Sequence, residues 1–398
     1  MKDFTYYAPT EVIFGPDTES RVGELVKKWG GTRVLLVYGG GSCIRSGLYD
    51  RVASSLGEAG IPFTALGGVV PNPRLSLVRD GIRTAHDEGI DFVLAVGGGS
   101  VIDSAKAIAA GVEYDGDVWD FFLRKTAPMK ALPVGAVLTI PAAGSEMSDG
   151  CVITREDECG DEKKSFSTNI CRPRFAVMNP ELTYTLPAYQ TSCGVVDIMM
   201  HTLERYFTRG GDMYLTDALA DALLRTVMTC GEKVLKAPED YSLRASIMWG
   251  SSLAHNDLTG LRGQGDWAVH GLEHEASGLF DVAHGAGLAA IWGAWANYVV
   301  EEAPERFARL AVSLFDIPAV MSTREETLAT ARAGIEAMRD YFRSIGMPVN
   351  LTELIGRRPT EEEIDHMAAM ATKNGTATLG SLRKLGLEDV KHIYHAAV

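Results

Sequence analysis

The sequence is poor in the features that mark secreted, membrane-bound and nucleic-acid-binding proteins. Its six cysteines, at positions 43, 151, 159, 171, 193 and 230, contain no CxxC pair and form no dense framework, which predicts a reduced, cytoplasmic compartment. Basic residues are in deficit, with 38 Lys and Arg against 52 Asp and Glu. The resulting net charge of −14 argues against a nucleic-acid partner, because the phosphates would be repelled.

Long hydrophobic runs are also missing. The segment MKDFTYYAPTEVIFG (1–15) has no apolar core, so we expect no secretory signal. The longest run, GAGLAAIWGAWANYVV (285–300), is shorter than the roughly 20 residues that a bilayer requires, and it predicts a buried helix rather than a membrane partner. A chain of 398 residues with 46% hydrophobic composition can bury a large core, and its length predicts two domains.

The first half of the chain alternates strand-like and helix-like segments. Four apolar runs have the character of buried strands, namely TRVLLVYGG (32–40), IPFTALGGV (61–69), IDFVLAVGGGS (90–100) and ALPVGAVLTIP (131–141). Strand followed by helix, repeated, predicts parallel strands joined by right-handed crossovers. After Pro187 long helical patterns such as REETLATARAGIEAMRDYF (324–342) take over. We therefore expect an α/β domain over residues 1–186 and a helical domain over 187–398. Capping boxes are predicted at Ser322 with Glu325 and at Thr360 with Glu363.

Two glycine-rich turns follow predicted strands. In AVGGGSVIDSAK (95–106) a strand runs into Gly97–Ser100 and a helix begins, so free N–H groups and the positive helix end suit a phosphate or pyrophosphate. The alternative is an ordinary tight turn, since the pattern is not GxGxxG. In YGGGSCIRSG (38–47) glycines leave uncharged the space where dinucleotide folds often place a ribose-binding acid. With Ser42 and Arg45 nearby, that space could accept a 2′-phosphate.

Histidines and one aspartate form a third pattern. Asp197 and His201 lie four residues apart on one face of the apolar helical stretch GVVDIMMHTLERYF (194–207). His270 and His274 are again four apart, and His284 follows after a predicted turn. These nitrogen and oxygen groups suit a divalent cation, which would also compensate a buried carboxylate. The alternative is a set of separate hydrogen-bonded core histidines, and spacing alone does not say which of the three later histidines bind metal.

The motifs together resemble the iron-containing (group III) alcohol dehydrogenase family, especially its NADP(H)-using, butanol-dehydrogenase-like aldehyde reductases. The matching pieces run in order along nearly the whole chain: YGGGS (38–42), AVGGGSVIDSAK, LTIPAAGSE (138–146), RPRFAVMNPELTYTLP (172–187), GVVDIMMHTLE and HGLEHEASGLFDVAHG (270–285). The resemblance implies a dinucleotide-binding α/β domain with a parallel sheet and an all-α C-terminal domain, an architecture similar to that of dehydroquinate synthase.

The resemblance also implies roles for individual residues. The metal ligands are expected to be Asp197, His201, His270 and His284, with Fe²⁺ or Zn²⁺ as the metal, and His274 is expected to line the site and relay a proton. The expected cofactor-binding residues are Gly39, Gly40, Ser42, Gly98, Gly99, Ser100, Asp103, Thr139, Ser145, Lys163 and Leu182. The glycines at 39 and 40 stand where NAD-preferring relatives often carry an aspartate, which favours NADP(H), with NAD(H) possible.

Two positions depart from the family pattern. Ala143 replaces a threonine that usually helps to hold the cofactor, and Cys193 stands where a small residue is common. The expected activity is hydride transfer between NADP(H) and a small primary alcohol or aldehyde, with aldehyde reduction favoured. The alternatives are an NAD(H)-dependent alcohol dehydrogenase, a lyase-type enzyme on the same fold, and a binding or sensor protein. The resemblance also implies a homodimer.

Overall fold

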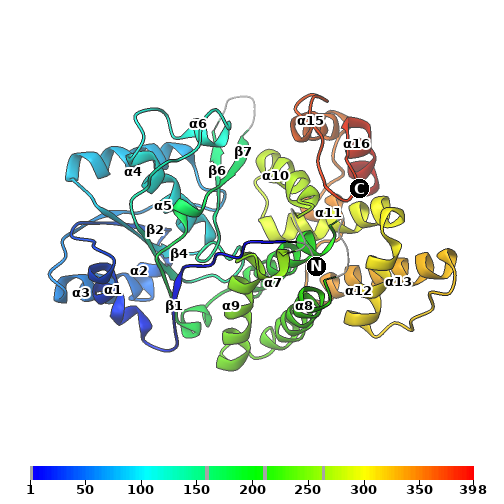
Figure 1. Cartoon of the computed structure of the whole chain (residues 1–398), viewed down its shortest axis with the longest axis horizontal. Helices are drawn as coiled ribbons and strands as arrows, with labels where there is room; N and C mark the ends of the chain where they lie inside the picture. Colours follow the sequence, from blue (N-terminus) through cyan, green and yellow to red (C-terminus); the bar gives the residue numbers. More distant parts are fainter. Residues whose placement is uncertain (1–2, 157–160, 209–212, 262–264) are drawn as a thin grey trace. The chain divides into compact units, whose positions relative to one another are not determined.

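The computed structural model describes residues 3–156, 161–208, 213–261 and 265–398. The chain divides into two compact units, which are taken in turn (Figure 1). One comprises Tyr7–Leu186 with Pro238–Asn256, and the other comprises Met1–Tyr6, Pro187–Ala237 and Asp257–Val398. The helix α9 (Tyr241–His255) is thus grouped with the N-terminal segment, although it begins 55 residues after that segment ends at Leu186. The domain boundary at residue 186 stays a prediction.

The first unit is built on a six-stranded parallel sheet with the order β1-β8-β5-β4-β2-β3. The strands are β1 (Glu11–Phe14), β2 (Val34–Tyr38), β3 (Phe63–Leu66), β4 (Phe92–Gly97), β5 (Val134–Leu138) and β8 (Phe175–Met178). The parallel sheet predicted from the sequence is confirmed, and each of the four predicted runs contains one of its strands. The strands β1 and β8 lie outside the four predicted runs.

Both faces of the sheet are covered, as its continuous apolar strands require. Alternate residues of β4 enter different cores: Val93 and Ala95 pack with α4 (Leu75–Glu88) and α5 (Gly99–Val112), whereas Phe92 and Leu94 pack with α1 (Val22–Lys28) and α3 (Leu48–Glu58). Figure 1 shows these two helix pairs on opposite sides of the strands. The remaining helical segments of the unit are η1 (Thr18–Arg21), α2 (Ser42–Arg45), α6 (Trp119–Phe122), η2 (Asn169–Cys171) and η3 (Pro180–Thr183).

An antiparallel pair, β6 (Gly150–Arg155) and β7 (Glu162–Ser167), lies outside the main sheet. Its inward side chains Cys151, Ile153 and Phe166 join the core that contains α5. The sequence did not predict this pair, since β7 reads EKKSFS and carries three charged residues among six. The strand β6 contacts the helix that follows the sharper glycine-rich turn, since Cys151 and Val152 both bond Asp103 of α5.

The second unit is helical, as the patterns after Pro187 predict. Its helical segments are α7 (Ala188–Tyr206), α8 (Tyr214–Val234), η4 (Leu258–Gly260), α10 (Ala268–Phe280), α11 (His284–Val299), η5 (Val300–Glu302), α12 (Pro304–Phe315), α13 (Arg324–Ser344), α14 (Leu351–Ile355), α15 (Glu361–Ala371) and α16 (Leu387–Ala396). The apolar run predicted as a buried helix forms α11, whose Trp292 and Trp295 are each 1% exposed.

Two helix starts test the predicted capping boxes. Thr360 and Glu363 form the box that begins α15, as predicted. The box at the start of α13 uses Thr323 and Glu326, so the prediction of Ser322 with Glu325 was wrong by one residue. Both Ser322 and Thr323 donate their backbone N–H to Glu326, which shows why adjacent hydroxyl residues make the sequence pattern ambiguous.

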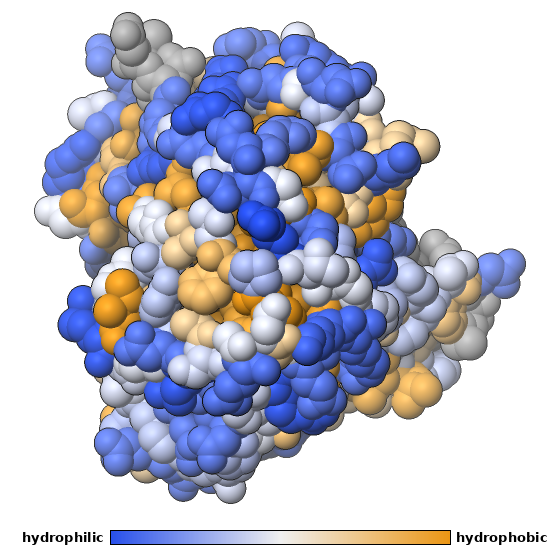
Figure 2. Space-filling view, turned by 90° about the vertical axis from the view of Figure 1, so that its left-hand side faces the viewer, coloured by the Kyte–Doolittle hydropathy of each residue, from blue (hydrophilic) through white to orange (hydrophobic). Residues whose placement is uncertain are grey.

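No helix within the described residues is long and apolar enough to cross a membrane. The face shown in Figure 2 is mostly hydrophilic, and hydrophilic side chains separate its hydrophobic ones into patches.

Candidate metal centre and dinucleotide-binding edge

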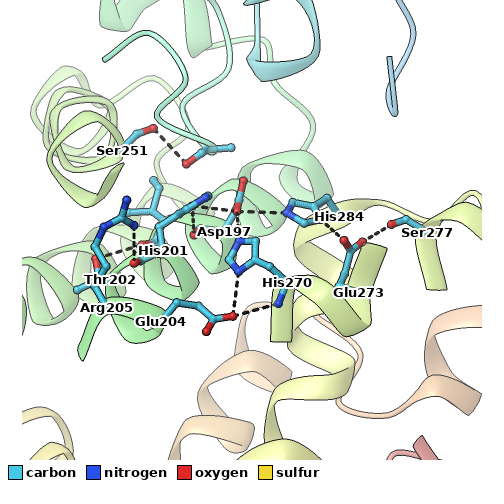
Figure 3. A network of polar contacts seen from close by, with 12 residues as sticks. Asp197, His201, Thr202, Glu204, Arg205, Ser251, His270, Glu273, Ser277 and His284 are labelled. Carbon is cyan, nitrogen blue, oxygen red and sulfur yellow. Dashed lines mark hydrogen bonds and ion pairs between the residues drawn. The ribbon is translucent and has the colours of Figure 1, made fainter. Parts of the chain in front are cut away.

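Four of the residues predicted to bind metal meet around one oxygen atom of the helical unit. Asp197 and His201 come from α7, His270 comes from α10, and His284 is the first residue of α11. The Asp197 Oδ1 atom lies 3.2 Å from His201 Nδ1, 3.9 Å from His270 Nε2 and 3.7 Å from His284 Nε2. Figure 3 shows the rings of His270 and His284 directed at this carboxylate. The three α-helices thus bring one carboxylate and three imidazoles to one point.

Hydrogen bonds select the tautomer of each imidazole. His201 Nδ1 donates to the backbone carbonyl of Asp197 at 2.9 Å, and His270 Nδ1 donates to Glu204 Oε1 at 3.1 Å. His284 Nδ1 in turn donates to Glu273 Oε2. Because a carbonyl or carboxylate oxygen only accepts, each Nδ1 carries a proton. For His270 and His284 this leaves Nε2, the nitrogen that faces Asp197 Oδ1, to bind a metal.

The donor set fits a divalent cation. Asp197 Oδ1 and His270 Nε2 are buried without a hydrogen-bond partner, which is costly unless something else satisfies them. Burial raises the pKa of the Asp197 carboxyl, but His201, His270 and His284 outweigh it and hold that pKa well below its usual range. Burial lowers the pKa of His201 to about 4. Burial also lowers that of His270, yet the neighbouring carboxylates of Asp197 and Glu204 raise the pKa to about 9. The buried carboxylate and the two atoms without a partner therefore suit a cation at this position.

His274 lies beside this cluster but not within it. Its ring centroid is 5.8 Å from that of His284, and Glu273, His274 and His284 form a second group with close ligand atoms. The Glu273 carboxylate accepts from His284 Nδ1 and from the Ser277 hydroxyl, so both its oxygens already have partners. The position agrees with a residue that lines the site, while the proton-relay role stays a prediction.

The helix α10 begins in an unusual backbone conformation. Trp267, the residue before it, has φ of 59°, which is rare for a bulky side chain. The guanidinium of Arg205 lies 4.8 Å from the Trp267 ring centroid, and the same ring lies 5.4 Å from that of His270. The cation–π contact offsets part of the backbone strain. Trp267 therefore forms an aromatic wall against the metal cluster.

Gly285 allows α11 to approach α7 closely at the metal cluster. A Cβ atom at this position would lie 2.1 Å from the backbone oxygen of Cys193, four residues before Asp197. We expect Gly285→Ala to lower the free energy of unfolding by about 1–3 kcal/mol or more, because the backbone must shift. The shift also displaces the adjacent His284, so zinc should raise the melting temperature less than in the wild type.

Gly57→Ala provides the control for this prediction. Gly57 lies within α3, and a Cβ atom there would have no neighbour within 4 Å. Since alanine is the better helix former, this substitution should stabilise by roughly 0.5–1 kcal/mol. A Gly285→Ala protein as stable as the wild type would show that the two helices have room to separate.

Cys193 belongs to the same face of α7. Its Sγ atom lies 3.8 Å from Met347 Sδ, and burial raises the pKa of the thiol to about 11. The side chain is therefore a neutral thiol near neutral pH and a poor nucleophile. It packs as a small, partly buried group one turn before the Asp197 carboxylate.

The predicted cofactor-binding residues lie at the carboxyl ends of parallel strands. Gly39, Gly40 and Ser42 follow β2, Gly98–Ser100 follow β4, Thr139 and Ser145 follow β5, and Leu182 follows β8. The chain leaves β2 toward β3 on one side, whereas β4 and β5 lie on the other side. The strand order thus reverses between β2 and β4, and open α/β sheets bind ligands at such a switch point. Both glycine-rich turns flank it.

The turn after β4 has the form of an anion site. Gly98 is extended with φ of −89°, and the 14-residue helix α5 begins at Gly99, so its first N–H groups are available. A Cβ atom at Gly98 would lie 3.0 Å from Ile140 Cβ, and one at Gly99 would lie 3.0 Å from Ala143 Cβ. The loop after β5 therefore packs directly on this turn, and Ala143 takes part in that packing.

Asp103 and Lys106 are buried on α5 beneath this turn. Lys106 Nζ donates to Ser145 Oγ at 2.8 Å and to the carbonyl oxygens of Ser148 and Gly150 at 3.0 and 2.8 Å. Ser145 Oγ donates to Asp103 Oδ1 at 2.5 Å. Burial raises the pKa of the Asp103 carboxyl and lowers that of Lys106. Asp103 and Ser145, predicted to line the cofactor, thus take part in an internal network that holds the loop after β5.

The turn after β2 carries no carboxylate. Gly40 and Ser42 are exposed, and Arg45 folds back so that its Nη1 atom would lie 2.5 Å from a Cβ at Gly41. Lys163 lies on β7, 8% exposed, and contributes a positive charge near Asp103. The two ends of the predicted cofactor site are therefore neutral to basic.

Comparison with known proteins gives a consistent relationship over the whole chain. The sequence model of iron-containing alcohol dehydrogenases matches residues 9–180, and that of the C-terminal part of Fe-containing alcohol dehydrogenases matches residues 191–398. The NADH-dependent butanol dehydrogenase A of Clostridium acetobutylicum is 40% identical over 99% of both chains. The NADPH-dependent aldehyde reductase YqhD of Escherichia coli is 33% identical over 100% of both. The crystal structure of NADH-dependent butanol dehydrogenase A from Thermotoga maritima superposes with a TM-score of 0.93 at 39% identity, covering 100% of this chain and 99% of the other.

Proposed function

The chain belongs to the iron-containing alcohol dehydrogenase family, and we propose that it reduces small aldehydes to primary alcohols with NADPH and catalyses the reverse reaction. Membership of this family makes it an NAD(P)-dependent oxidoreductase that acts on alcohols and aldehydes and uses a divalent metal. Family membership also favours hydride transfer over the lyase-type reaction that was the alternative. The observation that carries the proposal is that three histidines surround one carboxylate oxygen, Asp197 Oδ1. They are His201, His270 and His284.

We assign these four residues as ligands of Fe²⁺ or Zn²⁺. When bound, such a cation polarises an alcohol or aldehyde oxygen as a Lewis acid. His270 and His284 offer Nε2 because their Nδ1 atoms already donate hydrogen bonds. The His284 side chain is 26% exposed against 6% for Asp197, so the open side of the cluster is that of His284. His274, next to His284, is placed to exchange a proton with the substrate oxygen through water.

The nicotinamide cofactor is proposed to bind along the carboxyl edge of the sheet. The N–H groups after Gly98 and Gly99 would hold the pyrophosphate, while Thr139, Ser145, Lys163 and Leu182 would line the rest of the cofactor with Asp103. The network from Lys106 through Ser145 keeps this edge rigid, because it ties the loop after β5 to α5. A rigid edge holds the nicotinamide ring, which donates the hydride, in one orientation and excludes the other orientations that a mobile cofactor could adopt.

The choice of NADP(H) follows from charge at the adenosine end. A 2′-phosphate carries negative charge, and the turn at Gly39, Gly40 and Ser42 has a guanidinium beside it and no carboxylate. The second candidate is an NADH enzyme, which the names of the butanol dehydrogenases of Clostridium acetobutylicum and Thermotoga maritima favour. The name of the Escherichia coli reductase favours NADPH.

The decisive assay measures oxidation of reduced nicotinamide with butanal. Protein stripped of metal is tested with zinc or ferrous iron added back, and NADPH and NADH are compared at equal concentration. Metal-dependent turnover that prefers NADPH supports the reaction and the cofactor together. Turnover with NADH alone retains the reaction and overturns the cofactor choice, and metal-loaded protein inactive with every small aldehyde overturns the reaction.

Arg45→Ala tests the proposed 2′-phosphate contact. Loss of one charge-assisted hydrogen bond should lower kcat/KM for NADPH by about tenfold and leave kcat/KM for NADH unchanged. Arg83→Ala removes an exposed arginine of α4, paired with Asp80, and should change neither value. An equal loss with both cofactors would mean that Arg45 acts on the fold of the turn rather than on the phosphate.

We further propose that the enzyme is a homodimer, as the resemblance of its motifs to the family implies, and that it is cytoplasmic, as its cysteine pattern favours. The segment Glu11–Phe14 pairs with β8 of the same chain and forms the edge of the sheet. Light scattering of the purified protein gives the mass directly, and a mass of about one chain would overturn the proposal.

A further inference from the structure

Two buried carboxylates lie behind the metal histidines, and no sequence motif assigned them a role. Glu204 follows His201 by three residues on α7, and Glu273 follows His270 by three residues on α10. They are 2% and 0% exposed. A carboxylate is rarely buried so completely unless it is paired or bound to a cation. Their surroundings therefore need an explanation beyond packing.

Glu204 holds both the backbone and the ring of His270. Its Oε1 atom accepts the His270 backbone N–H at 3.0 Å and the ring Nδ1–H at 3.1 Å. Figure 3 shows these two bonds converging on one oxygen. Its Oε2 atom is buried and has no hydrogen-bond partner. His270 therefore supplies hydrogen bonds to only one of the two carboxylate oxygens. Burying the other oxygen without a partner is costly unless positive charge lies nearby.

Glu273 holds the ring of His284 from the opposite side. One oxygen accepts from His284 Nδ1, and the other accepts from the Ser277 hydroxyl one turn later on α10. The space for this carboxylate depends on Gly287, where a Cβ atom would lie 2.9 Å from Glu273 Oε1. The small residue three positions after His284 therefore permits the contact that orients His284.

The two contacts have the same consequence for the metal site. Each carboxylate accepts a hydrogen bond from the Nδ1–H of one histidine, which leaves Nε2 directed at Asp197 Oδ1 at 3.9 Å for His270 and 3.7 Å for His284. A carboxylate behind a histidine fixes its tautomer and makes its free nitrogen a better donor to a metal. Two such carboxylates also add negative charge around the position of a dication.

We propose that Glu204 and Glu273 are positioning residues that set the metal affinity of the site by orienting and polarising His270 and His284. The inference rests on the ligand set of the proposed function. It extends that set from four residues to two histidine–carboxylate pairs arranged around Asp197. It also explains the second histidine–carboxylate group, Glu273 with His274 and His284, as support for the first site rather than a second metal site.

The test measures metal binding without any substrate or cofactor. Glu204→Gln and Glu273→Gln keep the size of each side chain and remove its charge. Zinc affinity is measured by competition with a coloured chelator, and each variant is expected to bind roughly 10–100-fold more weakly than the wild type. The absorption bands of the Co²⁺-loaded protein should also shift, because the donor strength of one imidazole changes.

Two further variants separate charge from geometry. Glu362→Gln neutralises an exposed carboxylate of α15 and should leave zinc affinity and the Co²⁺ bands unchanged. Gly287→Ala leaves every ligand and every charge in place but pushes the Glu273 carboxylate away from its position. It should weaken zinc binding and shift the Co²⁺ bands in the same direction as Glu273→Gln.

The outcomes distinguish this inference from the proposed function. Unchanged zinc affinity together with unchanged Co²⁺ bands in both glutamine variants overturns the positioning role. Weaker binding in both supports it, whether or not the wild type turns over butanal, since no substrate is present. A variant of low stability still reports through its Co²⁺ bands, which are read on the folded fraction, and unshifted bands there count against the role.

Discussion

Asp197→Asn protein is expected to bind zinc or ferrous iron more than about a hundredfold more weakly than the wild type, and to lose aldehyde reduction in proportion. Removing a hydrogen-bonding partner of a metal ligand already lowers metal affinity roughly 10–100-fold. Asp197 is itself a proposed ligand, and its Oδ1 atom is the one around which the other three lie. Asparagine fills the same space but brings no charge to a dication. Competition with a chelator gives the affinity, and oxidation of NADPH with butanal gives the activity.

The control for this result is Asp340→Asn, which removes an exposed carboxylate of α13, 73% exposed, that pairs with Arg343. It should bind metal and reduce butanal as the wild type does. If Asp197→Asn binds zinc with unchanged affinity, the four proposed ligands are wrong. The group of Glu273, His274 and His284 would then be the next candidate, since its ligand atoms also lie within 4.8 Å of one another.

The parts of the fold that follow from the sequence are those fixed by long hydrophobic patterns. Each strand run of the first half and the buried helix α11 follow from apolar periodicity, because burial on both faces leaves little freedom in residue choice. The strands β1 and β8 have four residues each and pair with each other across 160 residues of chain, from Phe14 to Arg174. A local hydrophobic pattern does not indicate that two segments so far apart in the chain will pair.

The proposed metal site illustrates what spacing reveals and what it leaves out. Asp197 with His201 and His270 with His274 share helix faces by their four-residue spacing, yet spacing ranked His270, His274 and His284 equally. Contacts decide between them: His284 faces Asp197, while His274 lies beyond His284. The same periodicity could have found Glu204 and Glu273, each three residues after a histidine on its helix. A glutamate there is also typical of an exposed face, so the pattern alone did not single them out.

The buried network under the glycine-rich turn was outside the reach of sequence patterns. The sequence pattern puts Asp103 and Lys106 in the first turns of a helix, and Asp103 was expected to line the cofactor. The structure buries both because β6 and the loop after β5 cover α5. Such tertiary contacts decide burial and override the polar character of a single residue. Sequence motifs locate a candidate cofactor edge, and only the packing shows which of its residues hold other residues in place.

Lys106→Met is expected to lower the free energy of unfolding by about 3–5 kcal/mol, because it leaves the Asp103 carboxylate buried without its cation. Lys106 is fully buried, and it is joined to Asp103 through the Ser145 hydroxyl. Methionine has similar length but donates nothing to the carbonyls of Ser148 and Gly150, so these also lose a partner. The loop after β5 should loosen, and the KM for NADPH should rise. Urea unfolding followed by tryptophan fluorescence measures the first effect.

The pH dependence identifies the cause of this loss. Burial already raises the pKa of Asp103 above its ordinary value, and removing Lys106, which lowers it, raises it further. An acid whose pKa is higher in the folded state loses stability as the pH rises through that folded value. The deficit of the variant should therefore be largest in alkaline buffer and shrink as the pH falls and Asp103 is protonated.

Two controls complete this experiment. Lys125→Met removes a lysine that is 63% exposed and pairs with Asp120, and it should cost less than about 1 kcal/mol. Adding Asp103→Asn to Lys106→Met removes the uncompensated charge, so the double variant should be more stable than Lys106→Met alone at neutral pH. If the double variant is the less stable of the two, the Lys106 effect comes from the lost carbonyl contacts and not from the buried charge.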